Sequence, residues 1–204
     1  MKKFLAILLT VTLSFALTAC GNSDNKNNDS NNNDSSNVNQ SDADQASVKD
    51  ALELLNTVWN SYGDDEKFPA AGGDMSEENM TMDAPGKFSI EDTEALDTTL
   101  GFPSASIDKI DGAASLVHMM NANTFTCGVF HAKSSADVSD LTTALKDNIS
   151  QRQWMCGFPD KLVIVTIDDY VISFFGENEI VDTFKTKLST AYPSAETICD
   201  EPIA

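Results

Sequence analysis

The second half of the chain repeats one pattern, and this repeat constrains the fold more than any other feature. Residues 113–150 and 161–192 each consist of two short apolar stretches followed by a longer segment with apolar residues three and four positions apart. Short apolar stretches bounded by turn residues are typical of strands, and the wider spacing is typical of an amphipathic helix. Two strand–strand–helix units predict an α+β fold, a four-stranded antiparallel sheet with both helices on one face.

The sequence also places further elements around these units. Residues 161–167 are apolar almost without alternation, which indicates a strand covered on both faces. An N-terminal helix over 47–62, capped by Ser47, is the expected second cover. A short helix is expected over 90–100, and residues 63–89 show little regular pattern. The elements predicted within the repeat are strands 114–120 and 124–133, helix 137–153, strands 161–167 and 170–175, and helix 177–192.

The first nineteen residues have the composition of a secretory signal. Lys2 and Lys3 precede an apolar run over 4–17, which is shorter than the ~20 residues that a membrane crossing needs. The residues Leu17-Thr18-Ala19-Cys20 that follow resemble the lipobox of bacterial lipoproteins. The resemblance implies that residues 1–19 are removed and that Cys20 is lipidated. A lipid on Cys20 would hold the protein on the outer face of the cytoplasmic membrane.

Beyond Cys20, the composition separates a tether from a domain. In residues 20–45 the only large aliphatic side chain is Val38, and there is no aromatic one, so we expect a disordered Asn/Ser/Asp tether. Residues 46–204 have the size of one domain. The whole chain has a formal net charge of -19. A chain this acidic is repelled by nucleic-acid phosphates, and we expect no nucleic-acid partner.

Three cysteines remain in the domain, and an odd number does not indicate a disulfide framework. At most one bridge can form within the chain, and the pair Cys156–Cys199 is favoured. The alternative is that Cys127, Cys156 and Cys199 are all buried thiols that behave as small apolar residues.

The segment 154–159, Trp-Met-Cys-Gly-Phe-Pro, is unusually apolar for a connection between a helix and a strand. Burial against the sheet edge is the favoured interpretation. The alternative is a partner-binding site formed by Trp154, Met155 and Phe158, because exposed apolar patches often mark interactions.

Other combinations of residues suggest metal binding only weakly. His118-Met119-Met120 and Met80-Thr81-Met82 contain the soft ligands that Cu(I) prefers, and an acidic cluster over 64–78 contains oxygen ligands for Ca²⁺. Cys127 and His131 lie on one strand, four residues apart, without a second pair to complete a zinc site. The chain has no phosphate-binding glycine loop, GxSxG motif or HExxH motif. We therefore assign no catalytic residue and no cofactor.

A longer pattern carries a family resemblance. The lipobox, the tether and the segments FTCGVFHAK, ALKDNISQRQWMCGFPDKLVIVTIDDYVISFFG and FKTKL resemble small uncharacterised lipoproteins of Gram-positive anaerobes, some of which are labelled bacteriocin transport accessory protein. The resemblance covers roughly residues 48–195, and none of its motifs is tied to a known reaction. A tether joined to a compact domain without a convergent catalytic set favours a non-enzymatic, surface-anchored binding or transport-accessory module, with an envelope or transporter protein as its partner. The alternatives are a cell-envelope enzyme with an unrecognised site and a protein that binds copper or calcium.

Overall fold

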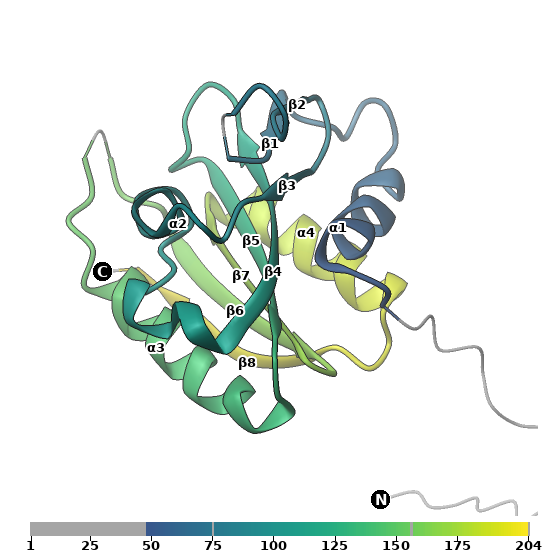
Figure 1. Cartoon of the computed structure of the whole chain (residues 1–204). Helices are drawn as coiled ribbons and strands as arrows, with labels where there is room; N and C mark the ends of the chain where they lie inside the picture. The colour runs from purple at the N-terminus through teal and green to yellow at the C-terminus, as the bar shows by residue number, and fades with distance from the viewer. Residues whose placement is uncertain (1–47, 75, 156, 204) are drawn as a thin grey trace, which may run out of the picture. The chain divides into compact units, whose positions relative to one another are not determined.

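The computed structural model describes residues 48–74, 76–155 and 157–203 (Figure 1). The predicted signal segment, Cys20 and the predicted tether lie outside these residues.

The described residues form a mixed α+β domain around one antiparallel sheet of eight strands. The strands follow the order β2-β1-β4-β5-β7-β6-β8 across the sheet, and β3 pairs with β4 beside this path. The strands are β1 (Ala70–Gly72), β2 (Thr81–Met82), β3 (Gly86–Phe88), β4 (Ile110–His118), β5 (Phe125–Ala132), β6 (Lys161–Ile167), β7 (Tyr170–Gly176) and β8 (Glu196–Pro202). The helices are α1 (Ala51–Asn60), α2 (Thr93–Leu100), α3 (Val138–Ser150) and α4 (Asn178–Ala191), with 3-10 turns η1 (Ser104–Lys109) and η2 (Ser135–Asp137).

The predicted repeat forms the centre of the sheet. The hairpins β4–β5 and β6–β7 lie side by side through β5 and β7, where Val129 pairs with Ile172 and Cys127 pairs with Phe174. The β6–β7 turn falls at Asp168-Asp169 as predicted, and Asp168 takes a φ of 49° there. Aspartate is one of the few residues other than glycine that adopts positive φ readily. The strand–strand–helix order of both units is therefore confirmed.

The predicted sheet of four strands is too small. On one side, β1, β2 and β3 add strands from the segment 63–89, and on the other side β8 pairs with β6. Strands of two or three residues are too short for a period of two to be visible. All residues of β8 except Cys199 are exposed, so this strand lacks the apolar pattern by which strands are identified.

The two repeat helices cover opposite faces of the sheet, which corrects the prediction that they share a face. Figure 1 shows α1 and α4 on one side and α2 and α3 on the other. The expected double cover of β6 is confirmed, but α3 supplies the second cover and α1 joins α4. The reason lies in β6 and β7, because both strands direct buried apolar side chains to both faces. Two helices on one face would leave half of these side chains in water.

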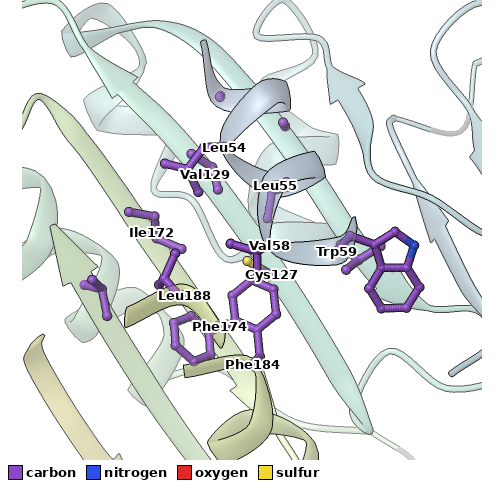
Figure 2. Close-up of a cluster of buried hydrophobic side chains, with 14 of the residues drawn as sticks. Leu54, Leu55, Val58, Trp59, Cys127, Val129, Ile172, Phe174, Phe184 and Leu188 are labelled. Carbon is purple, nitrogen blue, oxygen red and sulfur yellow. The ribbon is translucent and has the colours of Figure 1, made fainter. Parts of the chain in front are cut away.

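Each face has its own core. On the α1/α4 face, Cys127, Phe174 and Phe184 pack beneath Leu54 and Val58 (Figure 2). The opposite core, on the α2/α3 face, contains the buried side chains Phe102, Phe130, Leu145, Ile164 and Phe175. Neighbouring residues such as Phe174 and Phe175 therefore serve different cores, as expected for a strand whose side chains alternate between faces.

The ends of α1 and α2 follow local capping chemistry. α1 begins at Ala51 with Asp50 as its N-cap, and the Asp50 carboxylate accepts a hydrogen bond from the backbone N–H of Glu53 at 2.8 Å. The prediction that Ser47 caps this helix is therefore wrong, because Asp50 is the N-cap. Ser47 itself lies outside the described residues. Asp92 caps α2 in the same way, and Gly101 ends that helix with a φ of 69°.

Asp200 connects β8 to the rest of the domain. Its carboxylate lies 2.8 Å from the Lys161 ammonium on β6 and 2.7 Å from the Lys185 ammonium on α4. Burial favours a higher pKa for Asp200, but the hydrogen bonds from the two lysines outweigh burial, and the net effect lowers its pKa. A lowered folded-state pKa stabilises the fold above the unfolded carboxyl pKa of about 3.9, and this stabilisation is lost as the pH falls through the folded-state value.

We therefore expect Asp200→Asn to lower the free energy of unfolding by about 1 kcal/mol at pH 7, and by much less below about pH 3. Glu196→Gln is the matched control, because Glu196 is exposed on the same strand and should have little effect at either pH. Urea unfolding of both variants across this pH range measures the difference. A loss for Asp200→Asn that stays constant with pH would contradict the assignment.

Candidate functional site

Exposed apolar side chains gather at one end of the sheet. Among the described residues, seven large hydrophobic side chains are exposed, and six of them belong to loops or strands at this end. We call these six residues the methionine end: Met80, Met82, Met119, Met120, Met155 and Phe158. The seventh, Ile198, lies on β8 at the edge of the sheet. Single exposed apolar residues are common, so the placement of six of them at one end of the domain is the informative observation.

Strand pairing brings together the two chain segments that carry the first four of these methionines. β1 lies between β2 and β4, with Ala71 opposite Met82 on one side and opposite Val117 on the other. Met119 is the first residue after β4, and its backbone N–H donates to the Pro69 carbonyl at 2.9 Å. The two methionine pairs are far apart in sequence, so their proximity depends on β1, which the sequence did not predict.

A side-chain bridge connects the β4–β5 turn to the segment 154–159. The Asn123 amide donates to the backbone carbonyls of Met155 and Gly157, at 2.9 Å each. Gly157 adopts a φ of 113°, a conformation that favours glycine. This geometry places Met155 and Phe158, which are 80% and 69% exposed, beside the turn that holds Met119 and Met120.

The three residues predicted for partner binding therefore differ in their exposure. The favoured interpretation, burial against the sheet edge, is wrong for Met155 and Phe158. Trp154 is half-buried and packs edge-on against Phe175, with ring centroids 5.0 Å apart. Trp154 therefore fixes the base of the loop in the α2/α3 core, and Met155 and Phe158 project from it.

Two polar groups at the base of this loop lack partners among the described residues. The Arg152 guanidinium lies 5.0 Å from the Trp154 ring and donates through Nη2 to the Thr98 carbonyl. Arg152 Nη1 and Trp154 Nε1 are both buried without a hydrogen-bond partner. Burial also lowers the pKa of Arg152, and Asp97 partly opposes this effect. Buried donors without acceptors are destabilising, which makes these two groups candidates for contact with a partner.

The copper interpretation is not favoured by the position of His118. Its ring is stacked on Phe68 with centroids 5.5 Å apart, and Nδ1 faces the backbone N–H groups of Met120 and Asn121 at 3.3 and 3.4 Å. These contacts occupy Nδ1, so this nitrogen is not free to bind a metal.

The cysteines are buried rather than reactive. Cys127 lies in the α1/α4 core, and burial raises the pKa of its thiol well above the usual value. Cys199 is also a buried free thiol. Cys156, the other half of the favoured Cys156–Cys199 bridge, lies outside the described residues. The alternative of buried thiols is confirmed for Cys127 and Cys199.

Two of the acids proposed as calcium ligands, Glu66 and Asp74, are engaged in structural contacts. The Asp74 carboxylate accepts hydrogen bonds from Ser76, Asn79 and Ser89 at 2.8 to 3.1 Å. Glu66 accepts from the Gly63 backbone at 2.7 Å and from the Lys187 ammonium at 2.8 Å. Within residues 48–74, 76–155 and 157–203, no group of three or more His, Cys, Asp or Glu side chains is arranged to hold a metal ion.

Comparisons with known proteins identify no relative. No protein-family model matches the chain, and neither the curated proteins nor the solved structures contain a significant match. None of the described helices combines the length and the apolar character that a membrane crossing requires.

Proposed function

We propose that this protein is a lipid-anchored, non-enzymatic accessory module that binds another envelope protein through the methionine end. The observation that carries the proposal is the gathering of six exposed apolar side chains at one end of an otherwise well-packed domain. Methionine suits such a surface because its flexible, polarizable side chain adapts to the shape of a partner.

The position at which the chain enters the domain supports this role. The first described residue, Val48, lines a cavity beside Asp111 and Tyr170, where β4 and β7 begin. The methionine end lies where these strands finish, roughly 25 Å away at 3.3 Å per residue. The chain therefore enters the described domain at the end of the sheet opposite the methionine end.

The partner expected for this surface is a protein segment with aliphatic or aromatic side chains. Binding would cover Met155 and Phe158 and remove their exposed apolar surface from water, which is the main driving force of protein association. The base of the loop at Arg152 and Trp154 has unpartnered donors, which a rearrangement on binding could satisfy with carbonyl groups of the partner.

The test is crosslinking in cells that naturally make the protein, followed by mass spectrometry. We expect a recurrent envelope partner, and at least about tenfold less of it with the double variant Met155→Ser/Phe158→Ser, because buried apolar anchors dominate interface energetics. Ile198→Ser is the matched control, because it removes an exposed large hydrophobic side chain outside the methionine end. Cys20→Ser should abolish capture by removing the anchor.

Two results would contradict the proposal. One is the absence of any partner above background. The other is a partner retained equally by the double variant and by Ile198→Ser, because binding would then use a different surface.

A further inference from the structure

A second candidate site lies at the end of the sheet opposite the methionine end. A cavity of about 680 Å³ opens between the start of α1 and one end of the sheet. At this end β4 begins, β5 finishes and the β6–β7 turn lies. Its volume falls in the range typical of small-molecule sites, 300–1,000 Å³. Apolar residues, among them Ala51, Leu52 and Ala113, form part of its wall.

Two aromatic rings and a close contact between His131 and Asp111 give this cavity a defined polar lining. His131 Nδ1 lies 2.5 Å from the Asp111 carboxylate, which fixes the orientation of the imidazole. The His131 ring packs against Tyr170 with centroids 4.7 Å apart. These groups come from neighbouring strands, since β5 lies between β4 and β7, so the sheet itself holds them in place.

Tyr170 is the residue that points to a ligand. Its side chain is almost completely buried, with 6% of the residue exposed, and it lines the cavity. Its hydroxyl group is open to the cavity rather than fully buried, and no hydrogen bond joins it to another residue in the described part of the chain. Burial, and after it the charges of Asp50, Asp111 and Asp169, raise the pKa of Tyr170, so the hydroxyl stays protonated.

The charge around this hydroxyl indicates the kind of ligand. Asp50, Asp111, Asp168 and Asp169 line the cavity, against Lys49 and Lys87. Asp50 already caps α1, Asp111 faces His131 and Lys49 is paired with Glu53 at 3.0 Å, so Asp168 and Asp169 are the carboxylates without such a contact among the described residues. The aromatic faces of Tyr170 and His131 add a surface on which a cation is stabilised.

We propose that this cavity binds a small organic cation, namely a primary ammonium or guanidinium group on a short apolar chain. The carboxylates would accept its hydrogen bonds, the Tyr170 hydroxyl would gain a polar partner, and the apolar wall would cover the chain. The proposal is independent of the methionine end, which is formed by the opposite ends of the same strands.

The experiment uses the full chain carrying Cys20→Ser in mild detergent and measures binding by isothermal titration calorimetry. The cationic probes are 1,5-diaminopentane and the peptide N-acetyl-Ala-Lys-Ala-amide, and the neutral probe is N-acetyl-Ala-Gln-Ala-amide. We expect saturable binding of a cationic probe and none of the neutral peptide. Binding of the diamine alone assigns the site to free amines, and binding of the lysine peptide assigns it to basic side chains of peptides.

Matched variants locate the binding. Tyr170→Phe removes only the hydroxyl and Asp169→Asn removes one charge, and each should weaken binding at least about fivefold, because hydrogen bonds to charged groups are among the stronger ones. Asp65→Asn makes the same charge change outside the cavity and should alter affinity less than about twofold. Thermal unfolding of each variant checks that it is folded. The absence of saturable binding, equal binding of the lysine and glutamine peptides, or equal losses for Asp65→Asn and Asp169→Asn would overturn the proposal.

Discussion

Phe174→Ala is expected to lower the free energy of unfolding by about 3–5 kcal/mol, as large-to-small changes of buried aromatic residues do. Phe174 is completely buried in the α1/α4 core, and its ring packs edge-on against Phe184 with centroids 4.9 Å apart (Figure 2). Removing the ring leaves a cavity between the sheet and α4. The surrounding helices and strands can close such a cavity only in part.

Phe158→Ala is the matched control for this prediction. The same change of residue is made at a side chain that is 69% exposed, so the expected loss is within about 0.5 kcal/mol. Urea unfolding of the two variants and the unchanged protein gives both values. A loss below about 1.5 kcal/mol for Phe174→Ala would mean that this core is less tightly packed than described.

The centre of the sheet was predictable because its strands are long and apolar. β6 and β7 have seven residues each, enough for their pattern and the Asp168-Asp169 turn to be recognised. The arrangement of helices was also implied by these strands, because Phe174 and Phe175 are both buried and point to opposite faces. An amphipathic helix pattern shows only that a helix has an apolar face, and not which side of a sheet it covers.

The candidate site was predictable only in part, because one of the strands that form it is too short to show a pattern. Met155 and Phe158 were singled out by the apolar composition of a short connection, and their exposure makes them candidates for binding. Met82 and Met119 could not be added to them from the sequence, because their proximity depends on the three-residue strand β1. That strand has no periodicity, and its place in the sheet depends on a close approach between two backbone segments.

This close approach occurs between Gly72 and Gly86. A Cβ atom built on Gly72 would lie 2.0 Å from the backbone nitrogen of Gly86, and one built on Gly86 would lie 2.5 Å from the carbonyl carbon of Gly72. Nearby, the Gly73 N–H donates to the Ser115 hydroxyl at 2.9 Å, and this hydroxyl donates back to the Gly73 carbonyl at 3.2 Å. Any side chain at Gly72 must therefore push β1 away from the chain that leads into β3.

Gly72→Ala is accordingly expected to lower the free energy of unfolding by about 3 kcal/mol, at the upper end of the usual cost of overpacking. Because β1 positions Met82 beside β4, the same variant should also reduce crosslinking of the envelope partner, as Met155→Ser/Phe158→Ser does. The control is Gly112→Ala, whose added Cβ meets only the His131 Cβ at 3.7 Å, an ordinary contact. It should change stability by less than about 1 kcal/mol and leave partner capture intact.

The two readouts of Gly72→Ala separate the fold from the proposed function. A large loss of stability without loss of partner capture, measured below the unfolding temperature of the variant, would show that the partner contacts Met155 and Phe158 but not Met80 and Met82. Loss of both would support one continuous surface whose two halves are joined by β1. Unchanged stability would contradict the close approach itself, because a methyl group cannot occupy a position 2.0 Å from a backbone nitrogen without displacing it.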